Sequence, residues 1–194
     1  GNVGLSGCRV EERPPRAAPE RLAGGFTHRV TMRDGQIRTV HLYPGSGTFT
    51  PLPLVSPYMV AAVLTTEDGG FWRHDGFLPS QFRTALHRNL EAGQVRLGAS
   101  TITMQMVKNV LLSHERTLAR KLQEMFLTWY VESTLTKERI MEIYLNVAEW
   151  GPGIYGIEAA ARYHFKTSAA KLSRQQAALL AVSLPNPIDR VASK

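Results

Sequence analysis

Hydrophobic and polar positions follow a helical period through most of the chain beyond residue 50. The clearest case is residues 114–132, where apolar side chains recur at every third or fourth position and predict a long amphipathic helix. Those apolar positions are Leu118, Leu122, Met125, Phe126, Trp129 and Tyr130. Further helices are predicted where a capping residue or a Ser-Pro pair precedes an apolar run. The residues at these starts are Ser56, Ser100, Thr136 and Ser173. The pattern predicts a mainly α fold.

The pattern differs before residue 51. Two short extended runs, 26–32 and 36–42, flank Arg33-Asp34-Gly35, and an Asp-Gly pair in this position is typical of a β-hairpin. We therefore expect a hairpin in residues 26–50. Residues 1–25 are rich in Pro, Arg, Glu and Gly and predict a flexible lead-in. Residues 51–194 are expected to form the helical domain.

Composition narrows the functional classes. A chain of 194 residues suits one domain with a sizeable core. Its net charge of +7 favours anionic partners such as nucleic acid, anionic lipid or a phosphorylated substrate. A single cysteine excludes an internal disulfide framework.

No apolar run approaches the roughly 18 residues of a transmembrane helix. Any upstream signal or anchor would lie outside this sequence. Leu5-Ser6-Gly7-Cys8 resembles a bacterial lipobox, in which the cysteine is lipidated. The simpler interpretation is an incidental cysteine near a flexible end.

Two adjacent carboxylates, Glu67 and Asp68, stand at the end of an apolar segment. They are followed by a glycine-rich turn that carries Phe71, His74 and Gly76. A carboxylate beside an apolar wall can be desolvated, which makes it a usable proton-transfer group near neutral pH. This stretch is a candidate active site.

Two predicted helices carry candidate binding groups. Arg120 and Glu124 are one turn apart and share a face that Lys121 can reach. Arg116, near the start of the same helix, opposes the helix dipole and is better explained by an external anion. The preceding helix presents Gln105, Lys108 and Asn109. Solvated polar faces are the alternative interpretation of both sets.

Six short motifs, taken in order, resemble those of the peptidoglycan glycosyltransferases (glycosyltransferase family 51), and they are most similar to the monofunctional biosynthetic branch. The motifs are Glu67-Asp68-x-x-Phe71-x-x-His74-x-Gly76, residues 98–105 continuing to Lys108-Asn109, Arg120-Lys121-x-x-Glu124, residues 137–146, residues 149–165 and residues 176–187. One departure stands out: Met104 occupies the place of the first glutamine of the family's usual Gln-Gln pair.

The resemblance implies a lysozyme-like, mostly helical fold with a small membrane-facing jaw near residues 77–96, whereas the hairpin lies outside the matched motifs. It implies polymerisation of lipid II into β-1,4-linked glycan with inversion and release of undecaprenyl pyrophosphate. The expected place is the outer, periplasmic face of the bacterial cytoplasmic membrane. The expected partners are lipid II, the growing glycan chain, the membrane surface and proteins of cell-wall synthesis or division, with no role for nucleic acid.

The resemblance also assigns expected roles. Glu67 would be the base, and Glu124 the second essential glutamate. The substrate-binding residues would be Ser100, Thr101, Gln105, Lys108, Asn109, Arg116, Arg120 and Lys121. The supporting residues would be Asp68, Phe71, His74 and Gly76. No cofactor is required, although Mg²⁺ or Mn²⁺ could bridge the phosphates.

Three alternatives stay open on the sequence. A glycan-cleaving relative with Glu67 as general acid leaves the cations at Lys108, Arg116 and Arg120 unexplained. A catalytically impaired scaffold that binds lipid II has only Met104 in its favour. A nucleic-acid binder is suggested by charge alone, without a recognised motif.

Overall fold

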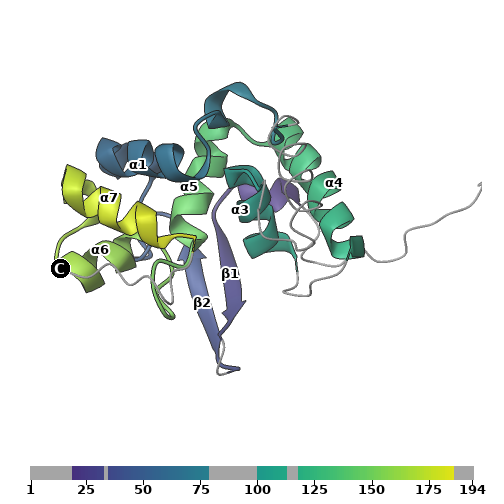
Figure 1. Ribbon diagram of the computed structural model, residues 1–194. Coiled ribbons are helices and arrows are strands. Elements are labelled where there is room, and N and C mark those ends of the chain that lie inside the picture. The colour runs from purple at the N-terminus through teal and green to yellow at the C-terminus, as the bar shows by residue number, and fades with distance from the viewer. Residues whose placement is uncertain (1–18, 33–34, 79–99, 113–117, 186–194) are drawn as a thin grey trace, which may run out of the picture.

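The computed structural model describes residues 19–32, 35–78, 100–112 and 118–185 (Figure 1). Within these ranges six α-helices and one two-stranded antiparallel sheet are found, which confirms the mainly α prediction with an N-terminal hairpin. The α-helices are α1 (Pro57–Glu67), α3 (Ile102–Leu111), α4 (Leu118–Thr134), α5 (Lys137–Val147), α6 (Ile157–Phe165) and α7 (Arg174–Ser183). The strands are β1 (Phe26–Thr31) and β2 (Ile37–Leu42). The short 3-10 turns are η1 (Pro19–Ala23), η2 (Leu52–Leu54), η3 (Phe71–Arg73) and η4 (Ala169–Lys171).

Helix α5 lies at the centre of the fold. It packs against α3, while α3 also contacts α4, and α1 and α7 pair on the other side of the molecule (Figure 1). A helix that is apolar on most of its surface is expected to be buried on all sides. The buried residues of α5 are Ile140, Met141, Ile143, Tyr144, Leu145, Asn146 and Val147.

The hairpin begins with Phe26 opposite Leu42 and ends with Thr31 opposite Ile37. Phe26 and Leu42 are buried and join the hydrophobic core, so the hairpin is packed against the helices at one end. In Figure 1 its far end projects away from them. Because alternate residues of a strand share a face, one side of this ribbon reaches the core and the other stays polar.

Residues 19–23 differ from the flexible lead-in that we expected for 1–25. They form η1, which contacts α4 and buries Leu22. The Arg139 guanidinium on α5 donates hydrogen bonds to the carbonyl oxygens of Leu22 (2.8 Å) and Gly24. These backbone contacts hold a segment whose composition alone suggested no structure. Residues 1–18 lie outside the described residues.

The helix starts follow the predicted caps with two corrections. Ser56 precedes α1, but its hydroxyl donates to the Leu172 carbonyl at 2.8 Å and makes no cap hydrogen bond. Thr136 and Ser173 cap α5 and α7 through their side chains, and Ser173 forms a complete capping box with Gln176. The cap of α3 is Thr101, whose hydroxyl accepts a hydrogen bond from the Met104 amide, and not Ser100. Ser100 and Thr101 both carry a hydroxyl that could cap α3. The backbone conformation of Thr101 makes it the capping residue.

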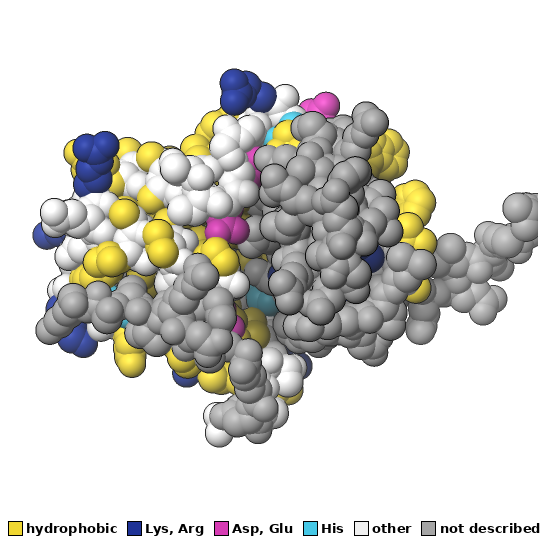
Figure 2. All heavy atoms as spheres, in the orientation of Figure 1, with side chains coloured by type: hydrophobic (Ala, Val, Ile, Leu, Met, Phe, Trp, Pro, Cys, Tyr) yellow, Lys and Arg dark blue, Asp and Glu magenta, His cyan; other side chains and the backbone are white. Residues whose placement is uncertain are grey.

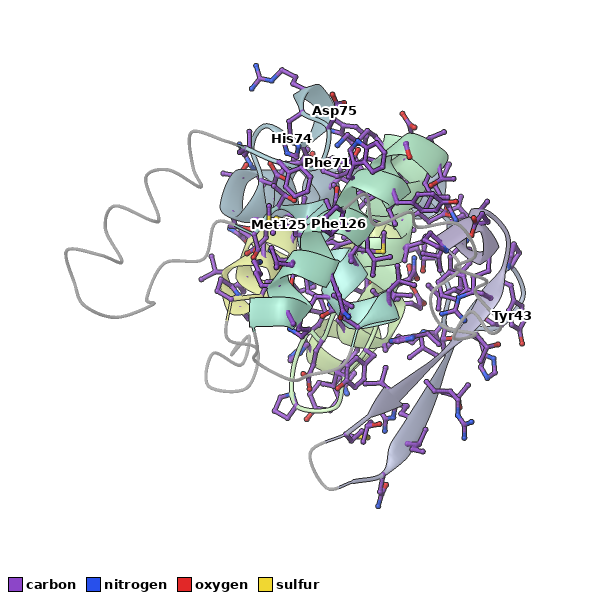
Figure 3. All side chains as sticks on the ribbon, turned by 90° about the vertical axis from the view of Figure 1, so that its right-hand side faces the viewer. Tyr43, Phe71, His74, Asp75, Met125 and Phe126 are labelled. Carbon is purple, nitrogen blue, oxygen red and sulfur yellow. The ribbon has the colours of Figure 1, made fainter. Side chains whose placement is uncertain are left out.

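Helix α4 is oriented differently from what its apolar pattern suggested. Phe126 and Trp129, which defined that pattern, are 73% and 64% exposed, whereas Glu124 is 1% exposed. In Figure 3 the labelled Met125 and Phe126 lie on this helix. Hydrophobic side chains gather at the right edge of Figure 2, on the side where Figure 1 shows α4. The first half of the inward face carries charged groups that pair with each other, as described below, whereas Val131 further along the helix joins the hydrophobic core.

Among the described residues, none of the helices combines the length and the hydropathy that a membrane crossing needs.

Gly156 tests the packing between α5 and the start of α6. It has φ +87°, and a Cβ there would stand 2.9 Å from the carbonyl oxygen of Asn146. We predict that Gly156→Ala lowers the free energy of unfolding by about 2–4 kcal/mol in urea denaturation, since left-handed strain and a backbone clash add together. Gly45→Ala is the matched control, with φ +86° and open space. An equal loss in both variants would show that the contact with Asn146 does not matter.

Candidate active site

Glu67 is the last residue of α1, and its two carboxylate oxygens differ. Oε2 accepts a hydrogen bond of 2.8 Å from Gln105 Nε2 on α3. Oε1 is buried and has no hydrogen-bond partner among the described residues. One oxygen is thus held in place, while the other keeps its capacity to accept a proton. A general base needs this combination of a fixed position and an open lone pair.

Asp68 is buried beside Glu67, but its carboxylate is fully engaged. Both of its oxygens lie 2.9 Å from His74 Nε2, and Oδ2 also accepts the Ile102 amide at 3.2 Å, at the N-terminal end of α3. The Gly76 amide donates to His74 Nδ1 at 3.1 Å. Since Nδ1 accepts, the ring proton is assigned to Nε2, which donates to Asp68. Asp68 thus joins the turn that contains His74 to the start of α3.

Gly76 fits closely between α3 and α4. Its carbonyl oxygen accepts a 2.7 Å hydrogen bond from the Thr101 hydroxyl. Its φ is +85°, and an added Cβ would lie 2.7 Å from Thr128 Cγ2 on α4. No other residue type fits here without displacing one of the two helices. The glycine therefore sets how closely the turn approaches α4.

Phe71 completes the wall behind the turn. Its ring is fully buried, and Lys137 Nζ from α5 stands 4.5 Å from the ring centroid. Figure 3 shows Phe71 and His74 together at one end of the molecule, whereas Tyr43 lies at the hairpin side. Phe71, His74 and Gly76 thus position the turn after Glu67, and the hydrogen bonds described for His74 and Gly76 do not involve the Glu67 side chain.

A second carboxylate, Glu124, holds two cations on α4. Its Oε2 lies 2.9 Å from Arg120 Nη2, and its Oε1 lies 2.5 Å from Lys121 Nζ. Lys121 Nζ is also 3.5 Å from the Ser100 hydroxyl, before α3. Glu124 is almost wholly buried, so the two cations offset the cost of burying its charge. Lys121 keeps about a third of its side-chain surface exposed, so its ammonium group can meet a ligand from solvent.

Burial and the charges of Glu124 and Glu67 affect the pKa of Lys108. Desolvation by the surrounding protein lowers its pKa from the ordinary value, although the side chain keeps contact with solvent. The charge of Glu124 opposes this shift most strongly, that of Glu67 opposes it less, and Arg120 and Lys121 reinforce it. Lys108 therefore lies close enough to Glu67 and Glu124 to interact with the charges of both. It adds a third cation to Arg120 and Lys121.

The structure groups most of the predicted site residues. Gln105 contacts Glu67, and Thr101 contacts the turn that contains His74 and Gly76. Asn109 is placed differently: it lines a cavity of about 340 Å³ together with residues of β1 and the end of α3. Arg116 lies outside the described residues, as does the predicted jaw from residue 79 onward.

One residue near Glu67 was overlooked. Tyr144 on α5 is 1% exposed, and its hydroxyl donates to Gln105 Oε1 at 3.2 Å. Burial raises its pKa well above the ordinary value, and the charges of Glu67 and Asp68 raise it further. Its place in an apolar helical pattern favours a core interpretation. The available signal was that a buried tyrosine needs a hydrogen-bond partner.

Two polar residues of α5 fix the chain ahead of α1. The Asn146 side chain accepts from the Thr50 amide and donates to the Thr50 carbonyl, both at 2.9 Å. Glu142 Oε2 accepts the Leu52 amide at 2.8 Å. The motif at residues 137–146 thus positions the segment that leads into the helix carrying Glu67.

A helical domain that sets an open carboxylate beside a cluster of cations has the groups of an acid–base group-transfer enzyme with an anionic substrate. Comparison with known proteins identifies the class. Residues 35–193 match the family model described as Transglycosylase. The chain belongs to this family, the peptidoglycan glycosyltransferases of family 51.

Three relatives are each described as a biosynthetic peptidoglycan transglycosylase. That of Agrobacterium fabrum is 55% identical over 146 residues, covering 75% of this chain and 64% of the relative. That of Rhizobium meliloti is 56% identical over 140 residues, covering 72% and 59%. That of Brucella suis is 54% identical over 140 residues, covering 72% and 62%. The chain spans about three fifths of the length of these relatives.

Asp68 offers a test of how the turn is held. Asp68→Asn puts an N–H group where the carboxylate accepts from His74 or Ile102, so one donor loses its partner. We predict a loss of about 1–3 kcal/mol in the free energy of unfolding. Asp75→Asn, an exposed change in the same turn, is the control and should have little effect. Thermal and urea denaturation measure both, and equal stability of the two variants would contradict the network.

The burial of the Met104 side chain predicts the effect of replacing it with glutamine. The side chain is 3% exposed, whereas its neighbour Gln105 contacts Glu67. A glutamine there would bury an amide at a cost of about 1–3 kcal/mol unless it finds partners. We predict that Met104→Gln lowers the melting temperature and does not raise the rate of glycan synthesis. A faster variant would show that an amide at this position takes part in the site.

Proposed function

We propose that this chain polymerises lipid II, the undecaprenyl-pyrophosphate-linked disaccharide-pentapeptide, into β-1,4-linked glycan. The single observation that carries the proposal is the combination of Glu67, with one held and one open oxygen, and the ion-paired cluster of Arg120, Lys121 and Glu124. Membership of the transglycosylase family and relatives named for peptidoglycan transglycosylation support the same reaction.

The proposed reaction is a displacement with inversion. The C4 hydroxyl of the acceptor sugar attacks the anomeric carbon of the lipid-linked chain. Its proton passes to Glu67 Oε1, and the bond between the anomeric carbon and the phosphate oxygen breaks, so the pyrophosphate leaves with the electron pair. A sugar hydroxyl is a weak nucleophile until a base removes its proton as the new bond forms. Gln105 keeps the carboxylate in place by its hydrogen bond to Oε2.

The cations meet the charge that develops on the pyrophosphate. Lys108 and Lys121 have ammonium groups with access to solvent, and Arg120 is fixed behind them by Glu124. Charged donors that are already in position stabilise a leaving group without reorganising during the reaction. Glu124 orients these donors in this proposal. Arg116, Ser100, Thr101 and Asn109 are assigned to substrate binding through the family resemblance.

A divalent cation such as Mg²⁺ or Mn²⁺ would add positive charge beside the leaving pyrophosphate, and Glu124 is the residue of the cluster that would hold it. Among the described residues no group of three or more His, Cys, Asp or Glu side chains could form a metal site. Oxygen ligands for such an ion would come chiefly from the substrate.

The proposed place of action is the outer face of the bacterial cytoplasmic membrane, where lipid II and the growing glycan chain meet. Proteins of cell-wall synthesis or division are proposed partners. The exposed Phe126 and Trp129 on α4 add apolar surface to a basic chain, which suits an anionic membrane surface.

Glycan cleavage is the competing reaction. A neutral glycosidic bond has no pyrophosphate, so Lys108, Arg120 and Lys121 would have no substrate charge to meet. A lipid II-binding scaffold would need a damaged site, but Glu67 and Gln105 are in contact, and Met104 lies in the interior. Synthesis accounts for more of the described groups than either alternative.

Glu67→Gln is the decisive variant. It keeps the shape of the side chain and removes the base, so the rate of polymerisation should fall about 10²- to 10⁴-fold. The assay uses labelled lipid II in detergent with separation of the glycan products. Glu138→Gln, an exposed change on α5, is the matched control and should retain the wild-type rate.

Three results would count against the proposal. Active wild-type protein that makes no polymer would exclude the synthase function. Release of fragments from finished peptidoglycan would favour the cleaving enzyme. Undiminished activity of Glu67→Gln would show that another group is the base.

A further inference from the structure

We propose that Tyr144 is a positioning residue for the reaction, because its hydroxyl fixes which end of the Gln105 amide faces Glu67. This inference rests on the proposed function, in which Glu67 is the base. Nothing in the motif pattern assigns such a role to Tyr144, which by sequence is one apolar position of α5.

The three side chains form a continuous chain of hydrogen bonds across three helices. The Tyr144 hydroxyl on α5 donates to Gln105 Oε1 on α3 at 3.2 Å. Gln105 Nε2 then donates to Glu67 Oε2 at the end of α1 at 2.8 Å. The Tyr144 O–H and the Gln105 N–H both donate in the direction of Glu67. The chain ends at the carboxylate, whose other oxygen is open.

A glutamine amide has two orientations of nearly the same shape, with oxygen and nitrogen exchanged. In the orientation described, an N–H faces the Glu67 carboxylate. In the other one, the amide oxygen would face a carboxylate oxygen, and two acceptors would repel unless Glu67 carried a proton. The first orientation therefore favours Glu67 in its ionised form, which is the form that a base requires.

The surroundings of Tyr144 leave its hydroxyl few other partners. The residue is 1% exposed, so bulk water does not compete for the O–H group. Burial and the nearby carboxylates raise its pKa well above the ordinary value, which keeps the hydroxyl protonated. A hydroxyl that retains its proton donates to Gln105 Oε1, whereas beside the inverted amide, which presents N–H groups, the O–H proton would lose this acceptor. The hydroxyl thereby disfavours the inverted amide.

Tyr144→Phe removes this oxygen and little else. With the hydroxyl gone, the Gln105 oxygen loses its donor, and the inverted amide becomes competitive. We expect kcat to fall about 2- to 10-fold, the range that corresponds to one hydrogen bond of ordinary strength. KM for lipid II should stay within about twofold, since Tyr144 contacts Gln105 and not the cations that meet the phosphates.

A matched control separates this effect from a general loss of a buried hydroxyl. Ser183 on α7 is buried, and its hydroxyl donates to the Leu180 carbonyl at 2.7 Å. Ser183→Ala removes one buried hydrogen bond far from the contacts of Glu67 and should leave kcat unchanged. Melting temperatures of both variants show whether their stabilities differ.

A double-mutant cycle tests whether Tyr144 acts through Gln105. Gln105→Met keeps the length of the side chain and removes the amide. In that background Tyr144→Phe should cause no further loss of kcat, because there is no amide left to orient. A loss that multiplies with that of Gln105→Met would mean that Tyr144 contributes only packing, and would overturn the inference.

The outcomes distinguish this inference from the proposed function. A wild-type protein without polymerase activity, or an active Glu67→Gln variant, would refute the function itself. An active wild-type and an inactive Glu67→Gln, together with a Tyr144→Phe variant as fast as Ser183→Ala, would overturn the inference alone.

A measurement on the wild-type protein covers the case in which Tyr144→Phe does not fold. In nuclear Overhauser spectra the side-chain NH₂ protons of Gln105 should lie closer to the Glu67 methylene protons than to the Tyr144 ring. The opposite pattern would show the inverted amide and overturn the inference.

Discussion

The carboxylate of Asp68 accepts hydrogen bonds from two segments that are distant in sequence, the His74 ring and the backbone amide that starts α3. Because Asp68 directly follows Glu67, these bonds also fix the end of α1 on which Glu67 stands. The Gly76 amide and carbonyl extend the network to His74 and to Thr101. The relative placement of α1, the turn and α3 thus depends on the buried carboxylate of Asp68. The position of the open Glu67 oxygen depends on the same carboxylate.

The two neighbouring acids show how similar residues acquire different tasks. Asp68 has all of its acceptor capacity directed to protein donors, which makes it a structural group. Among the described residues, Glu67 accepts a side-chain hydrogen bond only from Gln105 and keeps one oxygen open. Glu124 is a third case, buried between Arg120 and Lys121. A buried carboxylate is stabilised by paired cations or hydrogen bonds, and the kind of partner decides whether it can still react.

The sequence predicted the helices and the hairpin because caps, periodicity and the Asp-Gly turn are local features. It also predicted that Glu67, Gln105 and Glu124 belong to one site, through motifs. It could not show that α4 turns its apolar positions outward, since the same spacing fits either orientation and the buried ion cluster decides it. Nor could it show the role of Tyr144, because only the packing of α5 against α3 brings the hydroxyl to Gln105. The fold of residues 19–23 depends on Arg139, more than a hundred positions away.

Helix α1 is held at both ends by hydrogen bonds to other helices. Asn146 and Glu142 bind the backbone just before it, and Asp68 joins its far end to α3. For the proposed polymerisation, this has a mechanical meaning. Each addition shifts the glycan by one repeat, so the base must keep a fixed position to meet the next acceptor hydroxyl. Helix α1, anchored at both ends, would keep Glu67 in one position while the glycan moves.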